Sequence, residues 1–161
     1  MTQIILMSDS HEAKDAMEIV LKKLPDMDYY IHCGDCLVSP QKMNGFLTVA
    51  GNMDRCFPFP SQASLTIDPF HIWIIHGNQF LKGSAPDYPI LAKEAKKRGY
   101  NMVFFGHTHT YLDQTIDGVR LLNPGSVWKS REPSEPLSLM KITIDGQQCR
   151  TEKIRFVTLL Y

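Results

Sequence analysis

Seven side chains that can bind metals come directly after short apolar segments of the chain. They are Asp9, His11, Asp35, Asn52, His76, His107 and His109. A glycine or a serine stands beside nearly all of them. Imidazole, carboxylate and amide ligands together suit divalent transition metals such as Mn, Fe, Co, Ni or Zn better than Ca or Mg, which favour all-oxygen ligands. This residue set therefore indicates a transition-metal site.

The number of candidate ligands bears on how many ions they bind. Seven ligands are too many for one tetrahedral ion and suit two ions roughly 3.5–4 Å apart that share a bridging carboxylate. Such a pair holds a phosphoryl group through its oxygens and lowers the pKa of a bound water towards about 7. Hydroxide is then available at neutral pH. The chemistry that this indicates is in-line hydrolysis of a phosphate ester.

The apolar segments that precede these residues are too short to be helices and are predicted to be buried strands. They span residues 3–7, 29–33, 47–50, 70–75 and 102–105. One helix is predicted over 12–24 with Ser10 as its N-cap, and a second over 89–98. If the strands lie side by side, their carboxyl ends bring the candidate ligands to one rim of a sheet.

The later part of the chain is predicted to form two β-hairpins. Segments 111–116 and 119–122 flank Asp117-Gly118, and segments 138–144 and 149–156 flank Asp145-Gly146. Alternating strands and helices followed by hairpins predict an α/β layered fold with a mixed sheet, or two sheets packed face to face. The chain of 161 residues has room for one domain, 1–161. Residues 54–62, 78–86 and 129–136 are predicted loops.

Composition excludes several classes of function. Seventeen basic residues balance seventeen acidic ones, which argues against strong binding to nucleic acid or anionic lipid. No apolar stretch is long enough to span a membrane, and the first residues lack the features of a secretory signal. The four cysteines do not suggest a disulfide scaffold. We expect a cytoplasmic protein without a membrane partner.

Other residues carry competing interpretations. Cys33-Gly-Asp-Cys36 is formally a C-x-x-C redox motif, but it lies at a strand end and buried free thiols are favoured. His32 is interpreted as a structural residue that faces away from the Asp35 loop, and His71 as exposed.

Aromatic residues also have two interpretations. Trp73 alternates with isoleucines and is expected to pack in the core. Phe57, Phe59 and Trp128 lie in predicted loops and could stack on a base or an aryl leaving group. Burial against the domain or against a second copy in a homo-oligomer is favoured for them.

The order of these motifs resembles a known family. D-x-H at Asp9, GD at Asp35, GN-x-D at Asn52, HG at His76 and GH-x-H at His107 follow one another as in the calcineurin-like metallophosphoesterase superfamily. The small size and the NPGS sequence at 123–126 are similar to its YfcE-type branch of bacterial and archaeal phosphodiesterases. The resemblance implies a four-layer αββα sandwich with two mixed β-sheets.

The resemblance also implies a role for each residue. Asp9, His11 and His109 would hold the first metal ion, while Asn52, His76 and His107 would hold the second. Asp35 would bridge the two ions. The catalytic residues would be Asp35, Asn52 and His76, with Asn52 contacting the substrate phosphate. Apart from the resemblance, Arg55 is a cation expected near the site and a candidate for binding substrate. The implied cofactor is a pair of divalent ions, with Mn preferred over Ni, Fe, Co or Zn.

The chain departs from the family pattern at Met53. Many relatives have a histidine there that contacts the phosphoryl group or protonates the leaving oxygen. Met53 cannot donate a proton, and general-acid help of this kind is typically worth about 10²–10⁴-fold in rate. We therefore expect activated substrates or another donor, with Asp54 capping locally or pairing with Arg55.

The expected activity is hydrolysis of a small phosphodiester, such as an aryl phosphodiester or a cyclic nucleotide. Two other functions remain open. One is a phosphomonoesterase or protein phosphatase-like activity. The other is a metal-binding scaffold without catalysis, because the eukaryotic retromer subunit resembles this fold and serves as a scaffold.

Overall fold

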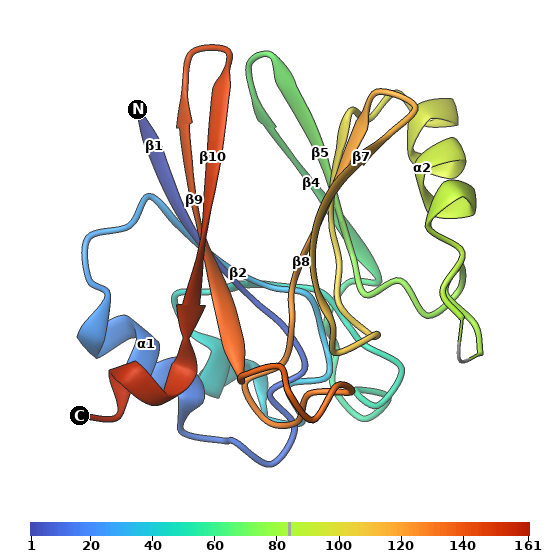
Figure 1. Cartoon of the computed structure of the whole chain (residues 1–161). Helices are drawn as coiled ribbons and strands as arrows, with labels where there is room; N and C mark the ends of the chain where they lie inside the picture. Colours follow the sequence, from blue (N-terminus) through green and yellow to red (C-terminus); the bar gives the residue numbers. More distant parts are fainter. Residues whose placement is uncertain (84) are drawn as a thin grey trace.

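Two five-stranded β-sheets pack face to face in the computed structural model, which describes residues 1–83 and 85–161 (Figure 1). The first sheet has the spatial order β10 (Gln148–Arg155), β9 (Ser138–Asp145), β1 (Thr2–Met7), β2 (Tyr29–His32) and β3 (Leu47–Thr48). The second has the order β4 (Gln62–Ile67), β5 (Phe70–Ile75), β6 (Met102–Phe104), β8 (Val119–Pro124) and β7 (Tyr111–Ile116). Both sheets mix parallel and antiparallel pairs, as expected.

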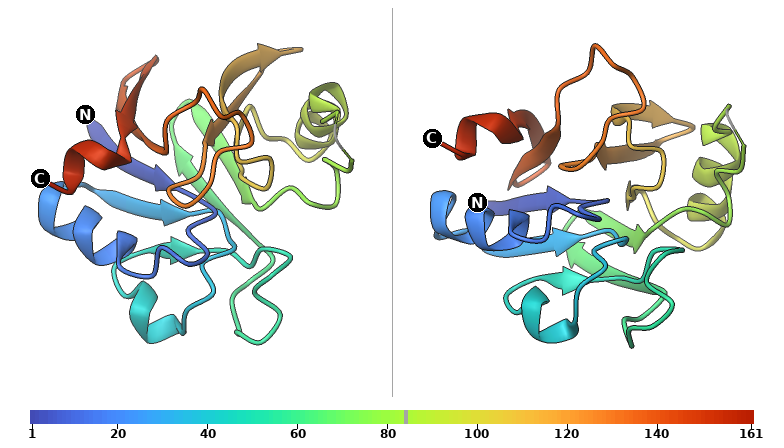
Figure 2. Two further views of the ribbon diagram at one scale, coloured as in Figure 1. Left: turned by 60° about the horizontal axis from the view of Figure 1, so that its bottom comes forward. Right: turned by 90° about the horizontal axis from the view of Figure 1, so that it is seen from below.

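Helices cover the two outer faces of this pair of sheets. Helix α1 (Ala16–Lys23) and the 3-10 helices η1 (Pro40–Met43) and η2 (Phe156–Leu159) pack on the first sheet, and α2 (Tyr88–Lys97) packs on the second (Figure 2). The four-layer αββα arrangement is therefore confirmed. No helix within the described ranges is long and apolar enough to cross a membrane.

The core follows from the alternation of side chains along each strand. In β1, Ile4 and Leu6 face the second sheet, whereas Ile5 and Met7 face α1. Strand β5 repeats the pattern, with Ile72 and Ile74 between the sheets and Trp73 and Ile75 against α2. Strands β1 and β5 are buried on both faces, which is why their sequences contain continuous runs of apolar residues.

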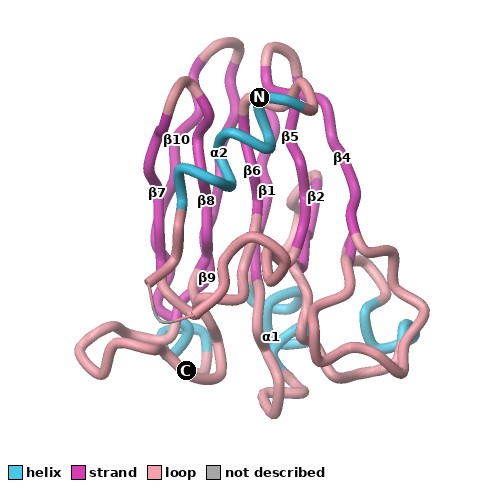
Figure 3. Tube along the Cα trace, turned by 90° about the vertical axis from the view of Figure 1, so that its right-hand side faces the viewer, coloured by secondary structure: helices cyan, strands magenta, loops and turns pink. Residues whose placement is uncertain are grey.

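The carboxyl ends of the central strands gather at one end of the molecule. Strands β1, β2 and β3 are parallel to one another, and so are β5, β6 and β8. Long loops lie at that end and the tight turns of the β4–β5 and β9–β10 hairpins lie at the other (Figure 3). The five predicted strands do not lie side by side, because three belong to the first sheet and two to the second. The predicted rim is instead the edge where both sheets end.

Two local expectations were wrong. The helix predicted over 12–24 begins only at Ala16, and its N-cap is Asp15 without a side-chain hydrogen bond. Ser10 is instead paired with His32 through its hydroxyl, 3.0 Å from Nε2. Strand β4 was not predicted, because its polar residues are exposed and its apolar ones only half-buried, as on a sheet edge. Of the loop predicted over 78–86, residue 84 lies outside the described residues.

Candidate metal centre

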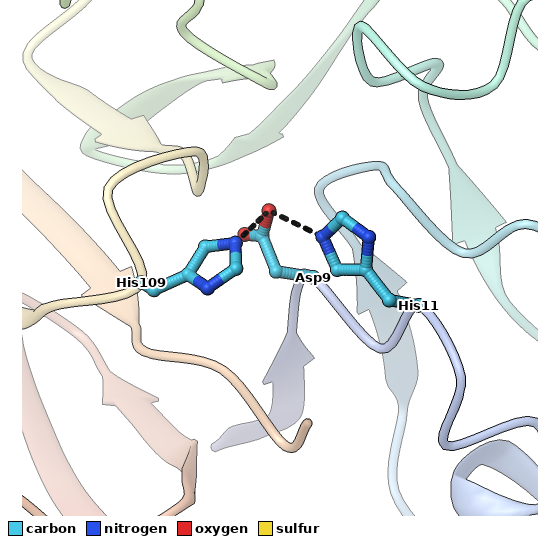
Figure 4. A group of neighbouring side chains, drawn as sticks. All are labelled: Asp9, His11 and His109. Carbon is cyan, nitrogen blue, oxygen red and sulfur yellow. Dashed lines mark ion pairs between the residues drawn. The ribbon is translucent and has the colours of Figure 1, made fainter. Parts of the chain in front are cut away.

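Asp9 lies at the centre of the candidate site, at the end of β1. Its Oδ1 atom lies 3.2 Å from Nε2 of His109, 3.7 Å from Nε2 of His11 and 3.8 Å from Nε2 of His76. The two nearest of these histidines converge on the carboxylate from opposite sides (Figure 4). Asp9, His11 and His109 thus form one buried group with ligand atoms close enough to share an ion.

A second buried group consists of Asp9, Asp35 and His76. Oδ2 of Asp35 lies 3.2 Å from Nε2 of His76 and 3.6 Å from Nε2 of His11. Asp35 therefore reaches histidines that the sequence assigned to different ions. Asp9 is common to both groups, so two carboxylates lie between the histidines. Two His/Asp triads of this kind are consistent with a two-metal site.

Asn52 and His107 complete the set beside the second triad. Nδ1 of His107 and Oδ1 of Asn52 face each other at 3.1 Å, and the rings of His76 and His107 are 5.2 Å apart. All seven predicted metal-binding side chains are thus brought to one place. The Arg55 side chain is exposed, and no hydrogen bond or ion pair links it to another described residue, so its contact with substrate stays a prediction.

Unpaired polar atoms show what the centre is suited to bind. Oδ1 of Asp9, Nε2 of His11 and Nε2 of His76 are buried without a hydrogen-bond partner in the described part of the chain. Buried polar atoms of proteins nearly always have partners. Three potential ligand atoms that face one another unpaired fit a bound cation, which would satisfy all of them.

Hydrogen bonds from outside orient these imidazoles. Nδ1 of His76 donates to the carbonyl of Cys33 at 2.7 Å, and Nδ1 of His109 donates to the carbonyl of Lys129 at 2.7 Å. Each bond places the proton on Nδ1 and leaves Nε2 free for a metal. The loop that follows β8 is therefore part of the centre, although the sequence analysis assigned Lys129 no role.

Asp54 has a role that the sequence analysis did not foresee. It was expected to cap locally or to pair with Arg55, but its buried carboxylate accepts hydrogen bonds from three backbone N–H groups. These belong to Asp35 at 2.6 Å, Gly51 at 2.8 Å and Leu37 at 3.0 Å. Asp54 thereby joins the loops after β2 and β3. In the sequence, only the GN-x-D spacing at residues 51–54 indicated a role for Asp54 at the site.

The backbone of the ligand residues is unusual. The φ angle is +53° at Asp9, +36° at His11, +57° at Asp35, +68° at His107 and +56° at His109. Such conformations cost residues other than glycine on the order of 1–3 kcal/mol each, and they persist where the surrounding structure imposes them. The backbone strain at this one site lowers the stability of the fold and holds these side chains in place.

Two glycines allow the loops to approach one another. A Cβ atom added to Gly106 would overlap Ser8 Oγ and Asp9 Oδ2, and one added to Gly51 would overlap the backbone and side chain of Asp35. The lack of a side chain at both positions therefore permits close backbone approach at this site.

The charges of the centre are strongly coupled. Burial alone would raise the pKa of Asp9, but His109 and His11 hold the pKa of this carboxyl below its usual range. Burial alone would lower the pKa of His76, but Asp35 and Asp9 raise it to about 9. Without metal, protonated imidazole therefore balances the carboxylates in the place that cations would take.

The remaining candidates are placed as follows. The cysteines at 33 and 36 are free and buried as predicted, and burial raises the pKa of the Cys36 thiol to about 12, which disfavours a redox role. His71 is exposed as predicted. His32 is structural, but it does not face away from the Asp35 loop, because its Nδ1 accepts a hydrogen bond from Gly34 N at 3.1 Å.

The two tryptophans also differ in setting. Trp73 is buried and stacks on Tyr100. Trp128 is 39% exposed, and its ring lies 4.6 Å from that of His11. Trp128 is therefore not fully buried within the domain and lies at the edge of the centre, while its predicted burial against a second copy stays a prediction.

Comparison with known proteins identifies related sequences. Residues 2–147 match the family model described as the calcineurin-like phosphoesterase superfamily domain. A probable metallophosphoesterase of Methanothermobacter thermautotrophicus is 31% identical over 161 residues, covering 93% of this chain and 90% of the relative.

Solved structures share the fold at lower identity. A predicted phosphoesterase from Streptococcus pneumoniae has a TM-score of 0.82 at 23% identity, over 97% of this chain and 90% of its own. Vps29 of Entamoeba histolytica complexed with zinc has a TM-score of 0.70 at 17%, over 96% and 99%. An archaeal phosphodiesterase has 0.65 at 22%, over 95% and 100%, and Yfce, a phosphoesterase from E. coli, has 0.67 at 18%, over 96% and 100%.

Proposed function

This chain belongs to the calcineurin-like phosphoesterase superfamily, and from that premise we propose that it is a phosphodiesterase that depends on two divalent metal ions. The observation that carries the proposal is the pair of buried His/Asp triads that share Asp9 and contain unpaired ligand atoms. When bound, two such ions supply an activated water and neutralise the phosphoryl oxygens. Mn is our first candidate, and a small phosphodiester is the substrate.

The seven side chains divide between holding ions and orienting substrate. We assign Asp9, His11 and His109 to the first ion, and His76, His107 and Asn52 to the second, with Asp35 between them. The Asn52 amide also carries an N–H group that can donate to a phosphoryl oxygen. The backbone N–H of Met53 donates to Asp35 Oδ1 at 2.8 Å and so fixes that carboxylate.

The preference for diesters follows from the residues around the metal centre. Met53 is 57% exposed at this edge and offers no proton to a leaving oxygen. A substrate with a good leaving group, such as an aryl or cyclic ester, needs no such proton. The archaeal structural neighbour, a phosphodiesterase, supports the same choice.

A comparison of substrates with matched variants tests the proposal. We expect the purified protein with Mn to hydrolyse bis(p-nitrophenyl) phosphate and a cyclic nucleotide faster than p-nitrophenyl phosphate. Asp35→Asn and His76→Ala should each lower this activity by at least about 10²-fold, while circular dichroism shows that the protein is still folded. His71→Ala, at an exposed histidine outside the centre, is the control and should keep full activity.

Each alternative has its own signature in this experiment. Faster release from the monoester would indicate a phosphomonoesterase. Mn binding without hydrolysis of any ester would indicate a metal-binding scaffold. Full activity of both variants after extensive chelation would refute the two-metal mechanism.

A further inference from the structure

A cavity of about 280 Å³ opens beside the metal centre, on the side of the second sheet. Its wall includes His107 of the centre together with Tyr88, Thr108, Thr110, Arg131 and Glu132. His107 faces Asn52 on one side and the cavity on the other. A group attached to a phosphate at the centre can therefore extend directly into this cavity.

Arg131 supplies an available positive charge to the cavity. Its guanidinium makes no hydrogen bond or ion pair with any residue in 1–83 or 85–161. The exposed Arg131 side chain and His107 line the same cavity. An arginine without a protein partner in a cavity is suited to a carboxylate or a phosphate of a ligand, which it binds through paired N–H groups.

The neighbouring wall supplies weaker polar contacts and one opposing charge. Thr108 and Thr110 line the cavity, and burial raises the pKa of the Tyr88 phenol, which keeps it neutral. Glu132 is acidic, and its carboxylate makes no hydrogen bond or ion pair among the described residues. Ligand cavities usually measure about 300–1,000 Å³, so this one fits a single small group rather than a polypeptide.

We propose that this cavity binds one ester group of the phosphodiester and that Arg131 selects ester groups that carry a carboxylate or a phosphate. This inference rests on the proposed phosphodiesterase activity and adds a substrate class to it. Arg131 acts here as a specificity-determining residue, and Glu132 limits the preference because it repels the same charge.

Two chromogenic diesters that differ only in charge test the inference. One is bis(p-nitrophenyl) phosphate, and the other is its analogue with a carboxylate on each ring, so that either ester group can enter the cavity. We expect Arg131→Gln to lower the ratio of kcat/KM for the charged to the neutral diester about tenfold. Glu132→Gln should raise that ratio. Arg155→Gln, at an exposed arginine of β10, is the matched control and should leave it unchanged.

A binding measurement separates failure of the cavity from failure of the activity. Calorimetry compares the carboxylated nitrophenol with plain p-nitrophenol on the Mn-loaded protein, and Arg131→Gln should abolish the preference for the carboxylated one. If the wild type cleaves both diesters and Arg131→Gln changes neither ratio nor binding, the cavity inference is overturned and the proposed function stands. If the wild type cleaves neither diester, the proposed function is overturned, and this inference with it.

Discussion

At the residue scale, Asp54 shows how a side chain that touches no substrate can determine whether the centre forms. Its carboxylate receives the N–H groups of Asp35 and Gly51, which are buried or half-buried. Asp54→Ala leaves these donors unpaired, and each such loss costs about 1–3 kcal/mol. We expect unfolding by urea to show a loss of roughly 3 kcal/mol or more, and Mn titration to show about 10–100-fold weaker binding.

The control for this variant is another aspartate that accepts a backbone hydrogen bond. Asp87 caps helix α2 by accepting from Ile90 N at 3.3 Å, away from the metal centre. Asp87→Ala should cost about 1 kcal/mol of stability, as removal of an N-cap does, without changing Mn affinity. Equal Mn affinity in Asp54→Ala and the wild type would contradict the role given to Asp54.

The raised pKa of His76 leads to a prediction about protons. With a pKa of about 9 in the metal-free protein, His76 is protonated at neutral pH and must lose its proton before Nε2 binds an ion. Mn binding at about pH 7.5 should therefore release close to one proton from this residue, falling towards half near pH 9. Calorimetry under nitrogen in buffers of different ionisation enthalpy measures the release. His71→Ala should release the same number, and a constant number across this range would contradict the prediction.

The same pKa sets how the stability of the metal-free protein depends on pH. Because the folded-state pKa of His76 lies above the usual 6.5, its contribution is fully present below about pH 6.5 and is lost as the pH rises through about 9. Urea unfolding of chelator-treated protein should show this decline. His76→Asn should flatten the decline in this window, and an equally steep decline in that variant would assign it to other groups.

At the scale of elements, Ser126 links the loop after β8 to the metal centre. Its hydroxyl donates to the carbonyl of Asp9 at 2.7 Å and accepts from the N–H groups of Trp128 and Lys129, both at 3.0 Å. Ser126→Ala should cost about 1–3 kcal/mol and loosen the Lys129 carbonyl that orients His109. Mn affinity should fall, and Trp128 emission should shift towards that of a solvated indole.

Ser138 provides the matched control for this loop. Its buried hydroxyl donates to the carbonyl of Pro124 at 2.8 Å and has no bond to the centre. Ser138→Ala should lose similar stability but keep the Mn affinity and the Trp128 emission of the wild type. If both variants behave alike, Ser126 contributes to stability only.

The elements that sequence predicted well are those with a strong local signal. Strands β1, β5 and β6 are short apolar runs that are followed by polar candidate ligands. Both the strands and the site residues could therefore be predicted from the sequence. Strand β4 was missed although its sequence alternates polar and apolar residues throughout, as expected of a half-exposed edge strand. In the contacts of Asp54 and of Lys129, one partner is a backbone group, and every residue type has such a group. These contacts could therefore be recognised only once distant loops were placed together.

At the scale of the whole molecule, the centre joins the two sheets. Asp9 and Asp35 follow β1 and β2 of the first sheet, while His76 and His109 follow β5 and β6 of the second. Elsewhere the sheets meet through the apolar core and through polar contacts near β10, where Arg120 donates to the carbonyl of Cys149 and Thr151 donates to Asp113. The unpaired ligand atoms from both sides make this edge the part of the interface that a cation would complete.

Metal ions should therefore stabilise the protein as a whole, because the folded state presents ligands from both sheets and the unfolded chain does not. At a free metal concentration about 100 times Kd, binding adds about 2.7 kcal/mol, which for this chain length raises Tm by roughly 5–10 °C. Thermal unfolding with Mn or with a chelator measures the difference. His109→Ala, which removes a ligand supplied by the second sheet, should lose most of the shift, whereas His71→Ala should keep it. An equal shift in His109→Ala would mean that the stabilising ion does not bridge the sheets through this residue.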